Sequence, residues 1–380
     1  MNVGILGGGQ LGKMLGWTGI PLGVRCRFLE PDPDAPAGVV GEVVHGSFQA
    51  PEVLCQFGQG LDVVTYEFEN VPVEAAEFLA RRHPVFPPPL ALKVSQDRLA
   101  EKQFAQGLGI ETPAFVPVGS RSDLAAGLKS LGRPAVLKTR RFGYDGRGQW
   151  LIRTDADADA AWASLNHVPA ILEAFVPFDR ELSIIAVRSR QGLMRCYSLI
   201  ENRHEGGILR QSIAPAPNLA ATLTSQAEAA AQAILSELSY VGVLAIEFFD
   251  VGGRLLFNEM APRVHNSGHW SIEGAVTSQF ENHLRAILGW ELGEAANRGV
   301  SAMLNLIGTT PPVEQLLRVP GAHVHLYGKA PRPGRKLGHV TVIAESNDEL
   351  QQRLGTLREI IASQDLHQAA HQAEQTSTPS

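Results

Sequence analysis

The sequence has few cysteines, no long apolar run and no excess of basic charge. Its three cysteines, Cys26, Cys55 and Cys196, are widely spaced and form no CxxC pair, so neither a disulfide framework nor a zinc cluster is expected. No apolar run approaches the roughly 18 residues that a membrane-spanning helix needs, and the first residues lack the basic start and apolar core of a signal peptide. The net charge of −6 argues against a broad nucleic-acid surface. We therefore expect a cytoplasmic protein without a nucleic-acid or membrane partner.

The composition that remains is that of a globular protein with two or three domains. The chain has 380 residues, of which 44% are hydrophobic and 19% charged, and these values exclude large-scale disorder. Strand-like segments at 2–7, 25–30 and 62–68 alternate with amphipathic helical segments at 10–19 and 73–82. This alternation predicts a parallel sheet covered by helices.

The pattern changes after the proline cluster at 86–89. A helix is expected from about 97 to 109, followed by a small α+β unit that contains a glycine-rich loop. From Glu181 onward, mostly antiparallel strands and one long helix at 223–239 indicate a further unit, and the polar tail from about His367 is expected to fray. These boundaries divide the chain into residues 1–96, 97–180, 181–366 and 367–380.

The first chemical signal is the motif GGGQLG, which places Gly7, Gly9 and Gly12 between a strand and a helix. Amide groups at the start of a helix form a phosphate site, and Glu30 ends the next strand, as a ribose-binding acid would. Three interpretations remain open from these residues alone: a nicotinamide dinucleotide, a phosphate of another ligand, or a purely structural turn.

The second signal is KTRRFGYDGRGQW at 138–150, a basic, glycine-rich segment in an acidic protein. Its glycines leave backbone amides free for phosphate oxygens, and Lys138 on the preceding strand has the charge and reach for a phosphate. The alternative is a solvated basic hairpin tip. The GxxxxGK[ST] motif of a P-loop is absent from the sequence.

The third signal is a pair of acids, Glu247 and Glu259, in apolar strands joined by a VGGR turn. Buried carboxylates without partners are costly, so this pair, with Asn258 beside it, indicates a hard cation such as Mg²⁺. Alternatively, each acid is an outward strand residue or a partner in an ion pair.

Two polar runs follow these acids. The run APRVHNSGHW places Arg263, His265, Asn266 and His269 beside the expected metal, where they suit a small anion, although either histidine alone is equally compatible with a structural role. The run YGKAPRPGRKLGH predicts a second anion site, for the phosphate of a substrate other than the nucleotide, or else a basic surface strip. Its basic residues are Lys329, Arg332, Arg335 and Lys336.

Together these motifs resemble the ATP-grasp superfamily and, within it, the N5-carboxyaminoimidazole ribonucleotide synthetase family. The likeness covers residues 2 to about 345 in the order GGGQLG, YEFEN, DRLAEK, KTRRFGYDGRGQW, NEMAPRVHNSGHW and RPGRKLGH. It implies an α/β and α+β ATP-grasp architecture: an N-terminal parallel-sheet (pre-ATP-grasp) domain, a small lid domain and a C-terminal, mostly antiparallel domain. It also implies ATP-dependent carboxylation of aminoimidazole ribonucleotide by bicarbonate in purine biosynthesis, with Mg²⁺ or Mn²⁺ as the cation, and a homodimer.

The resemblance also implies roles for individual residues. Metal binding falls to Glu247 and Glu259. The expected catalytic residues are Asp145, Arg263, His265 and Lys329, with Asp145 assisting deprotonation of the amine and Arg263, His265 and Asn266 beside bicarbonate. The expected ATP-binding residues are Arg98, Lys138, Gly143, Tyr144, Asp145, Gly146, Arg147, Gly148, Gln149, Glu173, Ala174, Phe175, Val176, Glu181, His204, Asn258 and Glu259. The expected substrate-binding residues are Gln10, Leu11, Glu69, Tyr144, Asp145, Asn266, Lys329, Arg335 and Lys336.

Three rival functions remain. Another ATP-grasp ligase, such as a formate-dependent glycinamide ribonucleotide transformylase, would share the metal acids but differ after Glu259. An NAD(P) oxidoreductase would use the first glycine motif. A binding-only relative would have lost the site, against which the intact acids, Lys138 and the glycine-rich loop argue.

Overall fold

The computed structural model describes residues 1–143, 146 and 148–376, and of residues 365–376 it describes the backbone alone. The N-terminal unit is a four-stranded parallel sheet in the order β3-β2-β1-β4. Its strands are β1 (Asn2–Leu6), β2 (Arg25–Glu30), β3 (Glu42–His45) and β4 (Val63–Tyr66). Its helical segments are α1 (Gln10–Gly19), η1 (Ile20–Leu22), η2 (Pro36–Val39), α2 (Pro51–Gly58) and α3 (Val73–Ala80). The parallel sheet predicted from the alternating pattern is confirmed; β3 and α2 are additional elements.

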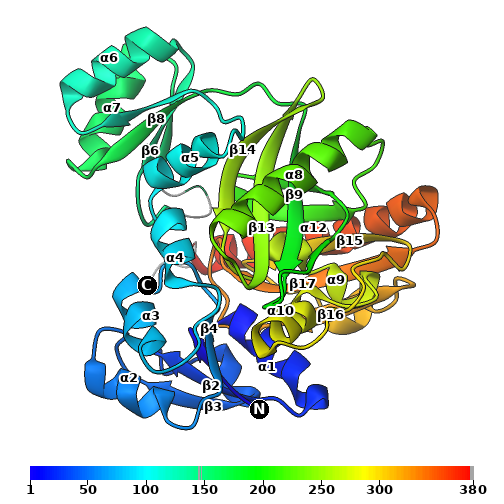
Figure 1. The fold of residues 1–380 in the computed structure, drawn as a ribbon. Coiled ribbons are helices and arrows are strands. Elements are labelled where there is room, and N and C mark those ends of the chain that lie inside the picture. The colour runs from blue at the N-terminus through cyan, green and yellow to red at the C-terminus, as the bar shows by residue number, and fades with distance from the viewer. Residues whose placement is uncertain (144–145, 147, 377–380) are drawn as a thin grey trace.

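Two helices, α4 (Pro89–Ser95) and α5 (Arg98–Gly107), lead into a small unit that projects at the upper left of Figure 1. This lid is an antiparallel sheet in the order β5-β8-β6-β7. Its elements are β5 (Phe115–Val118), α6 (Arg121–Leu131), β6 (Ala135–Thr139), β7 (Gln149–Ile152), α7 (Asp155–Leu165) and β8 (Ala170–Ala174). Asp97 caps α5 by accepting the amide hydrogen of Leu99 at 3.0 Å, and Arg140 next to β6 binds the same carboxylate at 2.6 Å. The start of α5 is thereby fixed to the lid.

The remaining strands form one antiparallel sheet in the order β14-β13-β9-β11-β12-β15-β17-β16, with β10 paired to β9. The strands are β9 (Arg180–Arg188), β10 (Met194–Cys196), β11 (Ile200–Glu205), β12 (Ile208–Ala214), β13 (Gly242–Val251), β14 (Arg254–Ala261), β15 (Val300–Ile307), β16 (Ala322–Leu326) and β17 (Lys336–Ala344). The helices are α8 (Ala221–Glu237), η3 (Asn266–Gly268), α9 (Ser271–Gly274), α10 (Gln279–Leu288), α11 (Val313–Leu316) and α12 (Asn347–Thr376). The predicted fold class is therefore confirmed.

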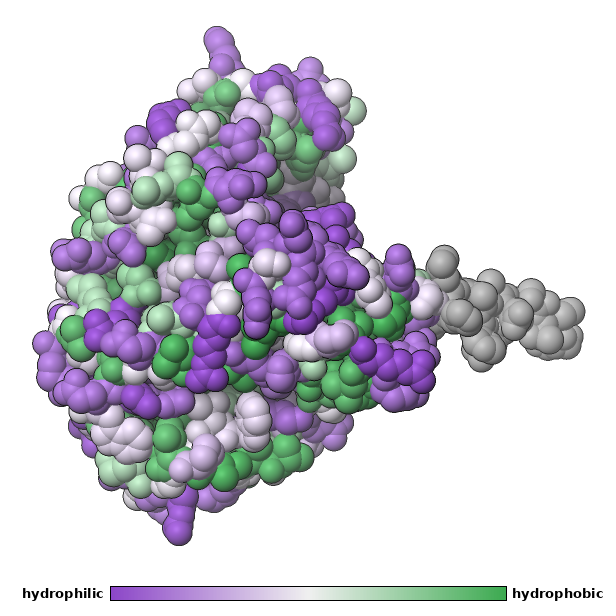
Figure 2. Space-filling view, turned by 90° about the vertical axis from the view of Figure 1, so that its right-hand side faces the viewer, coloured by the Kyte–Doolittle hydropathy of each residue, from purple (hydrophilic) through white to green (hydrophobic). Residues whose placement is uncertain are grey.

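Helix α12 differs from the prediction of a frayed tail from His367, because it continues through that residue to Thr376. The Gln- and Ala-rich composition that suggests a polar tail also has good helix propensity. Within the described residues, no helix combines the length and apolar character that a membrane crossing requires. Hydrophilic and hydrophobic residues are interspersed on the face shown in Figure 2.

The N-terminal and C-terminal units share one hydrophobic core, while the lid has its own. Leu11 and Met14 of α1 and Phe28 of β2 belong to the same buried cluster as Trp270 and Phe280 near α10. The lid core is a separate cluster built from α6, α7 and the strands between them. Because buried apolar contacts resist separation, this shared cluster makes the two larger units a common base, whereas the lid packs around a core of its own.

Candidate active site

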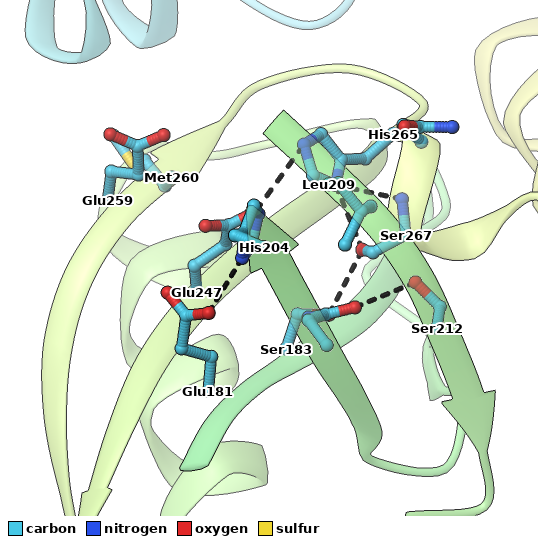
Figure 3. A network of polar contacts seen from close by, with 12 residues as sticks. Glu181, Ser183, His204, Leu209, Ser212, Glu247, Glu259, Met260, His265 and Ser267 are labelled. Carbon is cyan, nitrogen blue, oxygen red and sulfur yellow. Dashed lines mark hydrogen bonds and ion pairs between the residues drawn. The ribbon is translucent and has the colours of Figure 1, made fainter. Parts of the chain in front are cut away.

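The two acids predicted to bind metal face each other on neighbouring strands. Glu247 of β13 and Glu259 of β14 are paired in the register of the hairpin, and the register shifts directly after Glu247 (Figure 3). The hairpin turns at Gly252 and Gly253, whose φ angles of +57° and +83° lie in the left-handed region. Tight hairpin turns need this conformation, and glycine adopts it without strain. A β-bulge changes the direction of nearby side chains. The turn and the bulge thus place the two carboxylates side by side on neighbouring strands.

The two carboxylates have different electrostatic surroundings. Burial and the neighbouring Glu259 raise the pKa of Glu247 to about 7. Burial also acts to raise the pKa of Glu259, but the Arg98 guanidinium, 2.6 Å away, outweighs it and lowers this pKa to about 2. Beside them, Asn258 Oδ1 is buried and has no hydrogen-bond partner among the described residues.

A buried lysine–glutamate group lies next to this pair. Lys138 Nζ on β6 is 2.9 Å from Glu173 Oε2 on β8, and Lys102 Nζ on α5 is 3.5 Å from the same oxygen. Burial raises the pKa of the Glu173 carboxyl, but the two lysines outweigh burial and hold it below its usual value. Lys102 also donates to the carbonyl of Asn258 at 3.0 Å. This group therefore connects the lid strands to the metal-acid strand β14.

Sequence reasoning missed Lys102 and its neighbour Glu101. Lys102 is fully buried, and Glu101 accepts the amide hydrogen of Met260 at 2.7 Å. Burial and the nearby Glu259 raise the pKa of Glu101 to about 8. The available signal was the motif DRLAEK, from which only Arg98 was assigned to the site.

A cavity of about 430 Å³, here called cavity A, lies between the lid and the C-terminal sheet. Phe178 and Phe249 stack at its edge with ring centroids 4.8 Å apart, and such an apolar end suits a flat aromatic ring. Glu247, predicted to bind metal, also lines cavity A. Predicted ATP-binding residues that line it are Arg98, Lys138, Gly146, Gln149, Glu173, Ala174, Phe175, Val176, Glu181, His204, Asn258 and Glu259.

Two of the predicted ATP-binding residues form a pair in this wall. His204 Nδ1 and Glu181 Oε2 are 2.8 Å apart. Burial acts to lower the pKa of His204, but the hydrogen bond to Glu181 and the nearby Glu247 raise it above its usual value. Gly148 does not line cavity A; its carbonyl accepts the amide hydrogen of Thr139 at 2.8 Å and thereby shapes the loop.

A second cavity of about 680 Å³, cavity B, opens between the N-terminal unit and the C-terminal sheet. It shares His204, Gly207, Glu247 and Glu259 with cavity A, so the two cavities meet at the carboxylate pair. Predicted site residues that line it are Gln10, Leu11, Glu69, Gly143, Arg263, His265, Asn266, Lys329 and Lys336. It is also lined by Glu30, Phe48, Phe68 and Asn70, which the sequence analysis did not assign to substrate.

Several predicted anion ligands in cavity B are held by neighbours. Arg263 forms an ion pair with Glu69, and Lys329 donates to the side chain of Gln10. Asn266 and Asn305 exchange amide hydrogen bonds at 2.6 and 3.0 Å. These contacts hold the donors in a fixed arrangement. An anion then binds at a smaller entropy cost, because the side chains are already ordered.

Besides Gly148, the predicted residues Arg335 and His269 also lie outside both cavities. Arg335 donates to the carbonyl of Ala330 at 3.2 Å and is absent from the lining. His269 is buried against Phe280 and His339, with ring centroids 5.5 and 4.7 Å away. His269 therefore lines neither cavity, and these contacts favour the structural alternative for this histidine. The predictions for Tyr144, Asp145 and Arg147 lie outside the described residues.

The first glycine motif binds carboxylates of the chain itself. The amides of Gly9 and Gly12 donate to the carboxylate of Glu67 at 2.9 and 3.0 Å, and the amide of Gly8 donates to Glu30 at 2.8 Å. A helix N-terminus attracts an anion, and here a carboxylate of the chain itself occupies that place. These three amides are therefore already bound within the chain, and both oxygens of Glu30 accept backbone amides. Gln10 and Leu11 of the motif, and Glu30 itself, nevertheless line cavity B, so the phosphate interpretation stays a prediction.

Comparison with known families matches three consecutive parts of the chain. Residues 1–96 match the ribonucleotide synthetase preATP-grasp domain, residues 103–280 the ATP-grasp domain, and residues 301–353 the phosphoribosylaminoimidazole carboxylase C-terminal domain. The first match covers the N-terminal sheet, the second covers the lid and strands β9 to β14, and the third covers strands β15 to β17 of the same large sheet.

Comparison with individual proteins gives the same family. An N5-carboxyaminoimidazole ribonucleotide synthase of Pseudomonas aeruginosa is 49% identical over 95% of this chain and 99% of its own. The crystal structure of the Thermus thermophilus synthetase is 58% identical, with a TM-score of 0.91 over 94% of this chain and 98% of its own. The Aspergillus clavatus enzyme, solved with ADP and 5-aminoimidazole ribonucleotide, is 32% identical, with a TM-score of 0.89 over 95% of this chain and 98% of its own. The chain belongs to the N5-carboxyaminoimidazole ribonucleotide synthase family of ATP-grasp ligases.

Proposed function

We propose that this protein carboxylates 5-aminoimidazole ribonucleotide with bicarbonate at the expense of ATP, releasing ADP and phosphate. The observation that carries this proposal is the junction of cavities A and B at Glu247 and Glu259. A nucleotide in cavity A would direct its terminal phosphate toward that junction. There it would meet the anion donors Arg263 and His265 of cavity B.

Cavity A suits ATP in both shape and charge. The stacked phenylalanines offer an apolar wall for adenine, and the Glu181–His204 pair offers polar atoms for the ribose. Lys138 and Arg98 also line the cavity and supply positive charge for the phosphates. A relative, the Aspergillus clavatus enzyme, has been solved in complex with ATP, which supports ATP as the nucleotide.

The donors at the junction fit a hard divalent cation, and we propose Mg²⁺, with Mn²⁺ as a substitute. Two carboxylates and the unpartnered Asn258 Oδ1 are oxygen ligands, and Mg²⁺ takes one or two carboxylates and completes its shell with water and nucleotide phosphates. The described residues contain no cluster of three or more His, Cys, Asp or Glu that could hold a metal alone. When bound, the ion would neutralise charge on the phosphate oxygens.

The reaction follows from the chemistry of bicarbonate, which is a poor electrophile. A bicarbonate oxygen held by Arg263 and His265 attacks the γ-phosphorus of ATP, the bond to the β-phosphate breaks, and carboxyphosphate and ADP form. The exocyclic amine of the substrate then attacks the carboxyl carbon, directly or after release of CO₂ in place, and phosphate leaves. Lys138 and Arg98 stabilise the charge on the transferred group. Asp145, outside the described residues, remains our candidate for receiving the proton of the amine.

Cavity B would hold the ribonucleotide. Lys329 and Lys336 line it and carry the charge for the substrate phosphate, and Gln10 and Leu11 come from the start of α1. We further propose a homodimer in the cytoplasm and domain boundaries after residues 96, 180 and 366. Closure of the lid would exclude water, which hydrolyses carboxyphosphate.

Release of ADP, measured by a coupled assay with each substrate set, tests this function. Stimulation should require aminoimidazole ribonucleotide and bicarbonate together. Stimulation by glycinamide ribonucleotide and formate instead would identify the rival ligase. Mg-ATP should raise the unfolding temperature and NADH should not, because a ligand stabilises the folded state that binds it; the reverse result would identify an oxidoreductase.

A further inference from the structure

A chain of buried polar side chains leads through the C-terminal sheet to His265 (Figure 3). Ser212 Oγ donates to Asn202 Oδ1 at 2.8 Å, and Asn202 Nδ2 donates to Ser183 Oγ at 2.8 Å. Ser183 Oγ donates to Ser267 Oγ at 3.0 Å, and Ser267 Oγ lies 2.9 Å from His265 Nδ1. The chain thus runs from β12 through β11 and β9 to η3 and ends on the imidazole ring.

The backbone fixes which ring nitrogen of His265 carries the proton. The amide N–H of Ser267 donates to His265 Nδ1 at 3.3 Å. A backbone amide is only a donor, so Nδ1 must present its lone pair. In the neutral ring the proton is then on Nε2.

The polar chain independently gives the same assignment. The Asn202 amide donates to Ser183, so the Ser183 hydroxyl hydrogen is directed to Ser267. The Ser267 hydroxyl hydrogen then has His265 Nδ1 as its acceptor. With the opposite tautomer, the Ser267 hydroxyl hydrogen would lose that acceptor and its amide would face another N–H. Because an unpaired buried donor is costly, the observed network favours the Nε2–H form.

Packing alone gives no reason for these polar groups. Ser183, Ser212 and Ser267 are fully buried, and Asn202 is nearly so. Polar side chains in a sheet interior contribute less to stability than apolar ones of the same shape. The main chain of His265 is already held by Gln279, which accepts its N–H at 2.9 Å and donates to its carbonyl at 2.6 Å. The serine–asparagine chain therefore constrains the ring rather than the backbone.

We propose that Ser267, Ser183, Asn202 and Ser212 are positioning residues that hold His265 as the Nε2–H tautomer, so that His265 donates a hydrogen bond to bicarbonate and carboxyphosphate. The inference rests on the proposed function for the identity of that anion. His265 lines cavity B, and its Nε2 lies 3.7 Å from Glu247 Oε1 at the junction with cavity A. A nitrogen that carries a proton offers no lone pair, so the proton of the substrate amine goes to another acceptor. His265 then stabilises the carboxyl oxygens instead of acting as the base.

The tautomer is measured directly by two-bond ¹H–¹⁵N NMR correlation on the full-length protein labelled in histidine, with His265→Gln used to assign the signal. The wild-type protein should show the Nε2–H pattern at pH 8. Ser183→Ala should shift the signal partway toward a mixture of tautomers, because the Ser267 hydroxyl then loses the neighbour that directs its hydrogen to His265 Nδ1. Only the longer backbone contact of 3.3 Å would still favour Nδ1 as an acceptor. A wild-type ring protonated on Nδ1 would overturn the proposal. Because this NMR measurement does not require the enzyme to be active, it tests the tautomer of His265 even if the protein shows no carboxylase activity.

Kinetics separate positioning from general destabilisation. Ser183→Ala and Ser267→Ala should each lower kcat for carboxylation about tenfold, as expected when a reacting group is misplaced. The Kd for ATP should not change in either variant. Ser267→Thr keeps the hydroxyl and should therefore retain most of the wild-type kcat. The matched control is Ser301→Ala on β15, because Ser301 is fully buried and its hydroxyl has no partner among the described residues. Equal losses in Ser183→Ala and Ser301→Ala with an unchanged tautomer would show that the chain is only structural.

Discussion

Arg98 Nη1 lies 2.6 Å from Glu259 Oε2, whereas Glu247, directly opposite on β13, has His265 as its nearest ion-pair partner at 3.7 Å. The two acids therefore differ in their ionisation. Arg98 keeps Glu259 ionised, whereas burial and the neighbouring Glu259 raise the pKa of Glu247 to about 7. A cation that binds both must neutralise the repulsion between them. This asymmetry also links helix α5 to the metal site.

Replacement of Arg98 tests that link. Arg98→Met should raise the Kd for Mg-ATP at least tenfold, because a buried hydrogen-bonded charge pair loses one partner and the nucleotide loses a cation. Arg98→Lys should retain part of the affinity. Isothermal titration with Mg-ATP measures the effect, and wild-type affinity in Arg98→Met would exclude Arg98 from the nucleotide site.

Replacement of Glu247 tests the metal assignment. Glu247→Gln keeps the side-chain volume but removes one of the two anionic ligands, so the Mg²⁺ concentration for half-maximal activity should rise and kcat should fall by a factor of about 100. ADP release against Mg²⁺ concentration measures both quantities. Glu228→Gln on the exposed face of α8 is the matched control and should behave as wild type. An unchanged Mg²⁺ dependence in Glu247→Gln would contradict the assignment.

The parts of this site that follow from local patterns could be predicted from the sequence. Glu247 and Glu259 lie on strands joined by a two-glycine turn, and such a hairpin places the two acids close together on neighbouring strands. A regular hairpin would pair Glu247 with Asn258, and only the register shift after Glu247 pairs it with Glu259. The parallel sheet follows from its alternating periodicity in the same way. Both predictions depend only on residues that are near in sequence.

The parts that depend on distant partners could not be predicted. Lys102 is identified as a site residue only by its contact with Glu173, which comes from a lid strand. The glycine motif offers amides to an anion, but only the fold shows that Glu67 already accepts two of them. The tautomer of His265 depends on strands β9, β11 and β12, which contain no recognisable motif.

The Lys102–Glu173 contact leads to a stability prediction. Lys102→Met should lower the free energy of unfolding by about 3 kcal/mol, because it leaves a buried charge with one partner fewer. The exposed ion pair of Arg121 and Asp159, with both side chains about 60% exposed, supplies the control: Arg121→Met should change stability by less than about 1 kcal/mol. Urea unfolding of both variants measures the difference, and equal effects would show that burial of the Lys102 pair is unimportant.

The Glu67 carboxylate at the start of α1 should support substrate binding and not ATP binding. Glu67→Gln places an amide group against the donors of Gly9 and Gly12, which should cost about 1–3 kcal/mol of stability. It should also raise the KM for aminoimidazole ribonucleotide, because Gln10 and Leu11 lie at the same helix start in cavity B. The KM for ATP should not change. A rise in the KM for ATP alone would instead place the nucleotide at the glycine motif.

Stability should fall in mild acid because neutral histidines are buried between the two larger units. His283 Nδ1 accepts the amide hydrogen of Val243 at 3.1 Å, and Nε2 lies 2.9 Å from Thr65 Oγ1, so the neutral ring joins β13 to β4. Burial lowers the pKa of His283 to about 3, while in the unfolded chain it is about 6.5. Between these values the unfolded state binds more protons. The stabilisation is therefore fully present above pH 6.5 and is lost as the pH falls toward 3, at up to about 1.4 kcal/mol per pH unit for this group.

The variant His283→Gln isolates this contribution. It should be less stable than wild type at pH 8, because Gln fills the site imperfectly, yet its stability should fall less steeply between pH 6.5 and 5. Burial also lowers the pKa of His269 and of His339, so a pH dependence should remain in the variant with a slope smaller by about one proton. Urea unfolding at half-unit pH intervals gives both slopes. Identical slopes for wild type and His283→Gln would mean that His283 binds a proton in the folded protein as readily as in the unfolded chain.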